Sequence, residues 1–371
     1  MKKILIFKRI DIWNITNYNS IHKKFGNICP NFGNKLWYQG IISEISTPDN
    51  VLEYYDYSMN PEEINEKLCD LCRDIGEVSK EFITAVYETG GHFALRGYET
   101  ARFLEQLGYK NPAVVGCPSL FQCGRRLNIT KKAVHKERFK PAVNGSVDIA
   151  FDAMNGYDNS VYYDQDLYAN LLYNRDYYDN CTNQLKKVKK IINYDNSDFV
   201  LSRLISEGRI KLIADMWDWR NSLISEDFSM SFGTRIHGNI MALLSGVPAI
   251  IVPLDIRVRE MAEFYEIPHI PIDDVRQNKN LNLFDLFEKL DYTEFNKSFG
   301  EKYYAFQSFL IECGVIENQM NSDNVFFKHQ SSFDEKFINQ DSIELARYIL
   351  KHKKLCMMIK HFSKLKNTVK R

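Results

Sequence analysis

The sequence lacks long apolar runs, an excess of either charge, and an export signal. It contains no stretch of roughly 18 or more apolar residues, the length that a helix needs to cross a membrane. Its 48 basic and 48 acidic side chains give a formal net charge of zero, so the overall charge does not favour nucleic acid as a partner. The apolar run Ile4–Phe7 is too short for the core of a signal peptide, and we expect the protein to act in the cytoplasm.

The cysteines also lack an organised pattern. Eight of them are spread from Cys29 to Cys356, and without an export signal we expect all of them to be reduced thiols. The one close pair, Cys69 and Cys72, has neither a second pair nor histidines at zinc-binding spacing. We therefore predict no metal site and no obligatory cofactor.

What the chain does have is the length and composition of a globular protein with two domains. A single hydrophobic core rarely holds 371 residues, and 44% hydrophobic with 26% charged residues is ordinary for such proteins. A basic stretch without regular periodicity, residues 122–146, separates the two halves. We predict an N-terminal domain over residues 1–140, a second domain over 141–330 and a C-terminal segment over 331–371.

In both halves, short apolar runs typical of buried strands alternate with helical patterns. This alternation is typical of an α/β fold in which parallel strands lie between helices. In the first half we expect strands at Lys3–Phe7, Val51–Tyr55, Ile83–Tyr87 and Ala113–Gly116, and helices at about 34–45 and 98–107. In the second half we expect strands at Val147–Phe151, Lys211–Ala214, Phe228–Phe232 and Ala249–Val252, and helices at about 197–207, 217–225 and 236–244.

The turn from Gly233 to His237 joins a predicted strand to a predicted helix and carries the chemistry expected of an anion site. A helix N-terminus has unpaired N–H groups and a partial positive charge, which favour phosphate or carboxylate. Arg235 adds a planar guanidinium group that can hold an oxyanion by two hydrogen bonds, and His237 can donate to an anion or transfer a proton. The same two side chains could instead cap the helix and pair with nearby acids.

Further polar residues lie at the ends of other predicted strands or at the start of a helix. Parallel strands present ligands at their carboxyl ends, so we expect these side chains to face one cleft together with the Arg235 turn. A structural ion pair is the alternative role for each charged member. The residues are Asn34, Arg96 and Ser119 in the first half, and Arg257 and Glu260 in the second.

Three blocks of the sequence, in a fixed order, form a recognisable pattern. The last block is the run from Phe232 to Ile250, followed by Asp255-x-Arg257-x-x-Glu260. The turn Asn31–Asn34 comes first, and the middle block comprises Leu95–Thr100, Leu104–Gly108 and Val115–Phe121. Together these blocks resemble the signatures of the polysaccharide pyruvyl transferase family.

The resemblance implies two Rossmann-like domains that face a cleft, in an arrangement similar to GT-B glycosyltransferases. The C-terminal helical tail that we add to this fold is predicted from the spacing of apolar residues after Ser342. The resemblance also implies transfer of pyruvate from phosphoenolpyruvate, as co-substrate, to a sugar of a capsule, an exopolysaccharide or a lipid-linked precursor, forming a ketal. In that family an Arg-x-His run is implicated in donor binding. We accordingly expect His237, Arg235 and Glu260 to be catalytic, Arg235, His237, Gly238, Asn239 and Arg257 to bind the donor, and Asn34, Arg96 and Ser119 to bind the acceptor.

Two other functions and one residue role stay open at this stage. A GT-B glycosyltransferase that uses a nucleotide sugar would share the cleft and its arginines, although the Arg96 and Ser119 blocks favour pyruvyl transfer. A protein that binds capsule precursors without catalysis is the other alternative. The residue that would protonate the donor carbon is Glu260, Asp215 or Asp255.

The C-terminal tail has helical spacing of apolar residues and a basic face. From Lys351 onward it carries eight Lys or Arg residues and no acidic residue. Such a helix can dock on an apolar groove of its own protein, or it can lie on the anionic inner face of a membrane. The second role would suit an enzyme that works on lipid-linked sugars.

Overall fold

The computed structural model describes about three fifths of the chain. Three of the sequence predictions, the Asn34 helix, the role of Asp215 and most of the basic tail, lie outside the described residues. The described residues are 2–8, 50–56, 83–88, 90–165, 196–211, 213, 216–278, 281–316, 344, 346–347 and 350–352.

The largest sheet among the described residues has five parallel strands in the order β7-β6-β5-β8-β9. Numbered along the chain, this is the order 3-2-1-4-5 of doubly wound nucleotide-binding sheets. The chain turns back between β5 and β8, and ligands of such sheets bind at this switch point, beyond the carboxyl ends of the strands. The strands are β5 (Pro141–Asn144), β6 (Val161–Tyr163), β7 (Ile210–Lys211), β8 (Met230–Gly233) and β9 (Ala249–Ile251).

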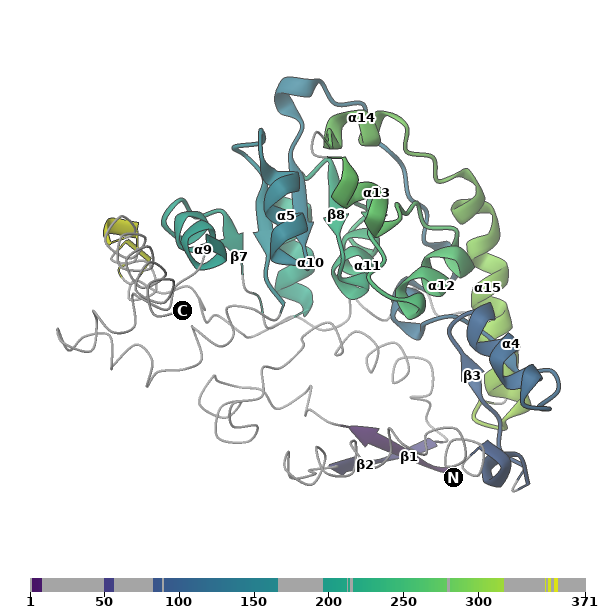
Figure 1. Ribbon diagram of the computed structural model, residues 1–371. Coiled ribbons are helices and arrows are strands. Elements are labelled where there is room, and N and C mark those ends of the chain that lie inside the picture. Colours follow the sequence, from purple (N-terminus) through teal and green to yellow (C-terminus); the bar gives the residue numbers. More distant parts are fainter. Residues whose placement is uncertain are drawn as a thin grey trace, which may run out of the picture.

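Helices connect and cover these strands (Figure 1). Helix α11 packs against both β8 and β9, and α5 packs against β5 and β8. The long helix α15 packs against α12 and against the 3-10 segment η1 (Pro118–Arg126). The helices are α5 (Val147–Met154), α9 (Asn196–Ser206), α10 (Met216–Ser225), α11 (Ile236–Leu244), α12 (Ile256–Tyr265), α13 (Ile272–Gln277), α14 (Leu283–Glu288) and α15 (Thr293–Glu312).

The described part of the first half also contains parallel strand pairs. Strand β1 (Lys2–Lys8) pairs with β2 (Asn50–Asp56), as the predicted strands at 3–7 and 51–55 anticipate. Strand β3 (Ala94–Leu95) pairs with β4 (Ala113–Val114), and the helix α4 (Tyr98–Gln106) lies between them in the sequence. The prediction of an α/β protein with parallel sheets is therefore confirmed, whereas two Rossmann-like domains around a cleft remain a prediction.

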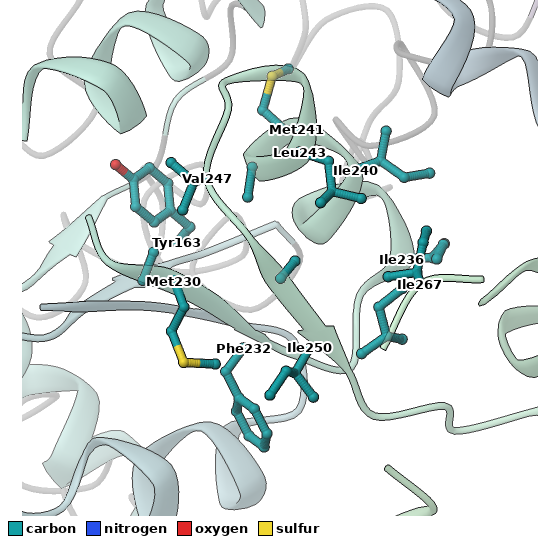
Figure 2. Close-up of a cluster of buried hydrophobic side chains, with 14 of the residues drawn as sticks. Tyr163, Met230, Phe232, Ile236, Ile240, Met241, Leu243, Val247, Ile250 and Ile267 are labelled. Carbon is teal, nitrogen blue, oxygen red and sulfur yellow. The ribbon is translucent and has the colours of Figure 1, made fainter. Parts of the chain in front are cut away.

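The core is centred on α11 and the strands beside it (Figure 2). All nine residues of α11 are buried, and its apolar side chains pack with those of β8 and β9. A helix that is buried on every side must find partners inside the protein for its polar groups. The polar residues of α11 are therefore fixed by their surroundings. The labelled cluster in Figure 2 includes Met230, Phe232, Ile236, Ile240, Leu243, Ile250 and Ile267.

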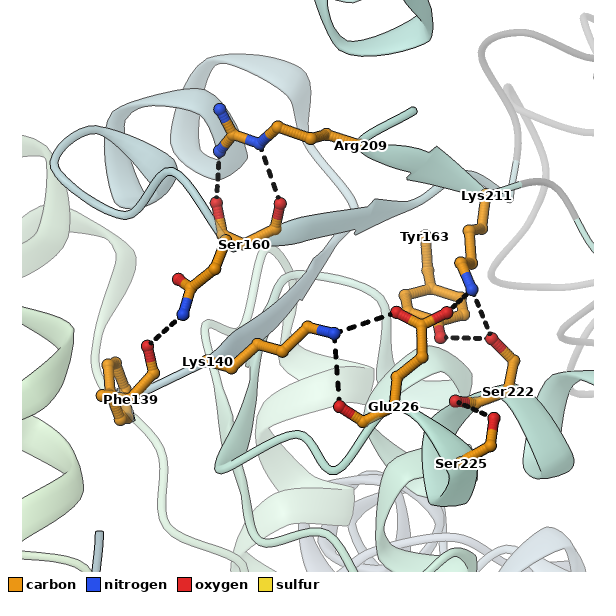
Figure 3. Close-up of polar contacts among 10 residues, drawn as sticks. Phe139, Lys140, Ser160, Tyr163, Arg209, Lys211, Ser222, Ser225 and Glu226 are labelled. Carbon is orange, nitrogen blue, oxygen red and sulfur yellow. Dashed lines mark hydrogen bonds and ion pairs between the residues drawn. The ribbon is translucent and has the colours of Figure 1, made fainter. Parts of the chain in front are cut away.

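A charged cluster ties the beginning of β5 to the end of α10 (Figure 3). The Glu226 carboxylate pairs with Lys140, at 3.1 Å from Nζ, and with Lys211. Lys211 Nζ also donates to Ser222 Oγ at 3.0 Å, and the Tyr163 hydroxyl lies 2.8 Å from the same oxygen. Partial burial lowers the pKa of both lysines. One carboxylate thus links the residue before β5, the strand β7 and the end of α10.

Two predicted strands are wrong. Residues 147–151 form the start of α5, and the strand of this region is the preceding segment Pro141–Asn144. Gly145 separates the two with a φ of +91°, and Ser146 with Asp148 supplies the polar start of a helix. Alternating apolar residues in Val147–Phe151 suit one face of a short helix as well as a strand.

The segment Ile83–Tyr87 was also expected to be a strand, but residues 83–88 are helical. Ile83 and Tyr87, which are one helical turn apart, pack in a small apolar cluster with Leu95. The helix ends at Gly90, which has a φ of +76°, and Gly91 N donates back to Val86 O at 2.8 Å. The Gly-Gly pair thus terminates a helix, where the sequence alone suggests a turn after a strand.

Candidate functional site

The carboxyl ends of β5 and β8 meet at the switch point of the sheet, and their turns are locked together. The Thr234 hydroxyl accepts a hydrogen bond from Ser146 N at 2.7 Å, and Thr234 N donates to Asn144 O at 3.3 Å. A Cβ on Gly145 would lie 2.1 Å from Thr234 Oγ1, so this close approach needs glycine. The turn that carries Arg235 is therefore held in one position.

A buried amide network fixes the start of α11. Asn144 Oδ1 accepts from Arg235 N at 3.1 Å, and Asn144 Nδ2 donates to Asn239 Oδ1 at 3.2 Å. Asn239 Nδ2 donates to Gly233 O at 3.0 Å and to Arg235 O at 3.1 Å. Ser231 Oγ completes the network with a 2.9 Å bond to Asn239 Oδ1. The sequence predicts that Asn239 binds the donor, but in the structure its side-chain amide forms hydrogen bonds that fix the backbone of the Arg235 turn.

Helix α11 begins without a side-chain cap. Arg235 occupies the N-cap position with an extended backbone, and its side chain makes no capping hydrogen bond to the helix. Uncapped N–H groups at a helix start carry a partial positive charge, and they favour the binding of an anion.

His237 is the second residue of α11, and its ring is largely buried. Burial, together with the smaller effects of the positive charges of Arg96 and Arg235, lowers the pKa of His237 to about 4. The imidazole is therefore neutral at pH 7. One arginine from each half of the chain therefore contributes to the low pKa of this imidazole.

Cys117 is the neighbour of His237 from the first half of the chain. Its Sγ lies 3.9 Å from His237 Nε2 and 3.0 Å from Ser119 Oγ. Complete burial raises the pKa of Cys117, against the smaller effects of Ser119 and the Arg96 charge, and keeps the thiol protonated. Its carbonyl oxygen accepts from the Tyr265 hydroxyl at 2.8 Å.

The structure thus brings together four predicted site residues and one that sequence reasoning missed. Arg96, Ser119, Arg235 and His237 surround the start of α11, directly or through Cys117. Cys117 could have been found from its place three residues after the strand Ala113–Val114, because strand ends of both halves were expected to face one site.

Glu260 has a different environment from the one expected of a catalytic acid. Its side chain is buried, and its carboxylate accepts from Thr100 N at 3.0 Å and from Thr100 Oγ1 at 2.8 and 3.1 Å. It thereby caps the start of α4 from α12, since Gly97 at the N-cap has no cap of its own. A Cβ on Gly97 would lie 2.5 Å from Glu260 Cβ, so the glycine permits this contact.

Arg257 lies at the surface, at the start of α12. Its Nη2 is 2.7 Å from Asp255 Oδ2, and its side chain is 68% exposed. Asp255 Oδ1 accepts from Val258 N at 3.1 Å and so caps α12. The hydrogen bond from Arg257 is the main reason that the pKa of Asp255 is lowered.

No group of three or more His, Cys, Asp or Glu side chains is placed to hold a metal ion in the part of the chain that the structure covers. Within the same residues, no helix combines the length and the apolar character needed to cross a bilayer.

Comparison with known proteins gives one match. The family model described as polysaccharide pyruvyl transferase matches residues 72–255, about half of the chain. This match contains Arg96, Cys117, Ser119, Arg235 and His237. No protein with a curated description and no solved structure matches the chain.

Proposed function

Because the chain belongs to the polysaccharide pyruvyl transferase family, we propose that it transfers the pyruvyl group of phosphoenolpyruvate to two hydroxyls of one sugar. The product is a pyruvate ketal on a capsule, an exopolysaccharide or its lipid-linked precursor. One observation carries the proposal. Arg96 and Arg235, from different halves of the chain, both contribute to the lowered pKa of a buried histidine, His237, at an uncapped helix start.

Phosphoenolpyruvate carries a phosphate and a carboxylate, and each needs cationic or N–H partners. The first turn of α11, including Gly238, and the Arg235 guanidinium supply such partners at one place. Arg257 would have to leave its ion pair with Asp255 to contribute, so we assign it a smaller share. On the acceptor side we assign Asn34, Arg96 and Ser119 to the sugar.

The proposed reaction begins when the methylene carbon of phosphoenolpyruvate accepts a proton. A sugar hydroxyl oxygen bonds to the resulting cationic carbon and gives up its proton. The C–O bond to phosphate then breaks, phosphate leaves with the bonding electron pair, and a second hydroxyl oxygen of the same sugar closes the ketal. Of the two hydroxyl protons released, one balances the proton added to carbon and the other ends on phosphate.

His237 suits the role of proton acceptor in this sequence. A neutral imidazole at pH 7 can take the proton of an attacking hydroxyl, and the imidazolium that results can neutralise the departing phosphate. The residue that protonates carbon stays open between Glu260, Asp215 and Asp255. Glu260 and Asp255 already hold Thr100 and Val258 respectively, so each would act from a hydrogen-bonded position.

A second function is favoured by one feature of the fold. The strand order of the main sheet is that of nucleotide-binding proteins, which would suit a GT-B glycosyltransferase that uses a nucleotide sugar. The two functions differ in the ligand at the start of α11, a single phosphate with a carboxylate in one and a diphosphate in the other.

Calorimetric titration with phosphoenolpyruvate and with a panel of nucleotide sugars separates these functions. We expect saturable binding of phosphoenolpyruvate that Arg235→Ala weakens by about tenfold or more, the effect of losing a charge-assisted contact. Binding of a nucleotide sugar alone would overturn the proposal. Mass spectrometry and NMR of products formed on synthetic or lipid-linked glycosides would then identify the ketal and its sugar.

The basic stretch 351–371 adds a proposal about location. We propose that it docks on the protein and presents its basic face to the anionic inner surface of the cell membrane. Sedimentation with anionic vesicles tests this contact, because removal of residues 351–371 should abolish it at low salt. Equal sedimentation of the full chain and the shortened chain would contradict it.

A further inference from the structure

Gln165 lies just beyond the carboxyl end of β6, at the edge of the sheet where α11 begins. Its side chain carries a buried polar group without a hydrogen-bond partner among the described residues. The residue is 3% exposed, and its Nε2 has no hydrogen-bond partner among the residues that the structure describes. A buried N–H donor without an acceptor lowers stability, so such a group in a well packed region calls for an explanation.

The unpaired amide lies against the first turn of α11. A Cβ on Gly238, the third residue of that helix, would sit 2.8 Å from Gln165 Nε2 and 2.9 Å from Asn144 Cγ. The neighbouring Asn144 amide is already bonded to Arg235 N, Asn239 and Ser231. Gln165 therefore adds a free donor beside the uncapped N–H groups of the helix.

We infer that Gln165 donates a hydrogen bond from Nε2 to the phosphate group of bound phosphoenolpyruvate, and that this phosphate lies over the first turn of α11. The inference rests on the proposed function and extends it by one binding residue and by the orientation of the donor. An anion at this place would accept from the helix N–H groups and from the Gln165 amide together, so two sets of unpaired donors share one ligand.

The phosphate is assigned to this place ahead of the carboxylate because its three oxygens can accept from several N–H groups that converge. The amide itself is neutral, so it contributes direction without adding charge to a region that already holds Arg96 and Arg235. The donor carboxylate is then left to a guanidinium group, whose two parallel N–H bonds match its geometry.

The test uses calorimetry with three probes: phosphoenolpyruvate, inorganic phosphate and pyruvate. Gln165→Met keeps the length of the side chain and removes the donor, and Gln165→Glu keeps its shape and adds a negative charge. We expect Gln165→Met to weaken phosphate and phosphoenolpyruvate by about tenfold and to leave pyruvate unchanged. Gln165→Glu should weaken both phosphorylated probes further, because like charges repel.

Thermal unfolding of the free protein adds a readout that a purely structural role would not give. Removing an unpaired buried donor should leave the melting temperature of Gln165→Met equal to or above that of the wild type. Ser202 on α9 is the matched control, since its Oγ is also buried and unpaired among the described residues. Ser202→Ala should likewise keep its stability, but it should bind all three probes as the wild type does.

The outcomes separate this inference from the proposed function. Binding of phosphate to Gln165→Met with wild-type affinity would overturn the inference while leaving the pyruvyl transfer proposal intact. If the wild type binds phosphate but not phosphoenolpyruvate, the proposed function fails, and weaker phosphate binding by Gln165→Met still establishes the Gln165 site. Loss of pyruvate binding with intact phosphate binding would place the carboxylate at Gln165 and contradict the orientation.

Discussion

The turns that follow β8 and β9 lead from adjacent parallel strands into helices at the same edge of the sheet. They differ in whether a side chain caps the helix that follows. At the β9 turn, Asp255 caps α12 and its second oxygen pairs with Arg257 at the surface. At the β8 turn, α11 has no side-chain cap, and a buried histidine lies beside two arginines.

We propose that the β8 turn binds a ligand, whereas the β9 turn is complete without one. At the β9 turn the charges of Asp255 and Arg257 pair with each other. An exposed ion pair of this kind contributes about 0–1 kcal/mol to the free energy of unfolding. At the β8 turn the helix start has no side-chain cap, and the network around Asn144 and Asn239 fixes the backbone of the turn. The predictions below test this contrast.

The largest effect is expected from His237→Ala. Loss of proton transfer should lower the turnover number by about 10² or more while the protein stays folded. Steady-state kinetics with saturating donor measures this, and a circular dichroism spectrum checks the fold. Turnover equal to that of the wild type would make His237 a structural residue and remove the distinction between the turns.

The pH dependence of stability should differ between the two turns. His237 takes up a proton near pH 6.5 when unfolded but only at about pH 4 when folded, so protonation favours unfolding. Its stabilising contribution, about 3 kcal/mol, is complete above pH 6.5 and is lost as the pH falls toward 4. The contribution of Asp255 is complete above its usual pKa of 3.8 and is lost only below that value.

Urea unfolding between pH 4 and 7 provides the measurement. The free energy of unfolding should fall less steeply with acid in His237→Asn than in the wild type, and Asp255→Asn should leave the slope in this range unchanged. Parallel curves for the wild type and His237→Asn would show that the folded protein does not depress the pKa of this histidine.

Thr100→Val tests the contact through which Glu260 joins α12 to α4. The variant removes the one hydroxyl that donates to the two oxygens of a buried carboxylate, and we expect a loss of about 1–3 kcal/mol in the free energy of unfolding. Thr100→Ser, which keeps the hydroxyl, is the control and should lose much less. If both variants are equally stable, the hydroxyl does not hold Glu260.

Arg257→Ala should have the smallest effect. Because Arg257 is exposed and paired with Asp255, its loss should change stability by less than about 1 kcal/mol and donor affinity by less than about threefold. Arg235→Ala is the matched comparison, from the other turn, and should cost about tenfold or more in calorimetry. Equal losses in the two variants would mean that both turns bind the donor.

Much of the fold could be predicted because its signals are local. The end of α11 at Gly246, with a φ of +77° and a hydrogen bond from Val247 N to Ala242 O, follows directly from a glycine at the helix C-terminus. The strand β8 is likewise encoded in a few consecutive residues, Phe228–Phe232. By contrast, the pattern in Val147–Phe151 suits two structures, and the packing around α5 decides between them.

The site could be predicted only in part, because several of its properties depend on contacts between distant segments. The depressed pKa of His237 requires burial and the charge of Arg96, which lies 141 positions away in the printed sequence. Sequence spacing likewise gives no sign that Glu260 caps α4 or that Cys117 faces the histidine. Asn239 lies on the predicted helix, but its role in shaping the turn appears only with its buried partners.

The most direct test of the central claim is an NMR titration of the His237 imidazole with and without phosphoenolpyruvate. In the free protein we expect a pKa of about 4. A bound anion at the start of α11 favours the charged imidazole, so saturating phosphoenolpyruvate should move this pKa upward by one unit or more, on the order of the usual effect of a nearby opposite charge. The same titration curve with and without saturating phosphoenolpyruvate would contradict the claim that the β8 turn holds the donor.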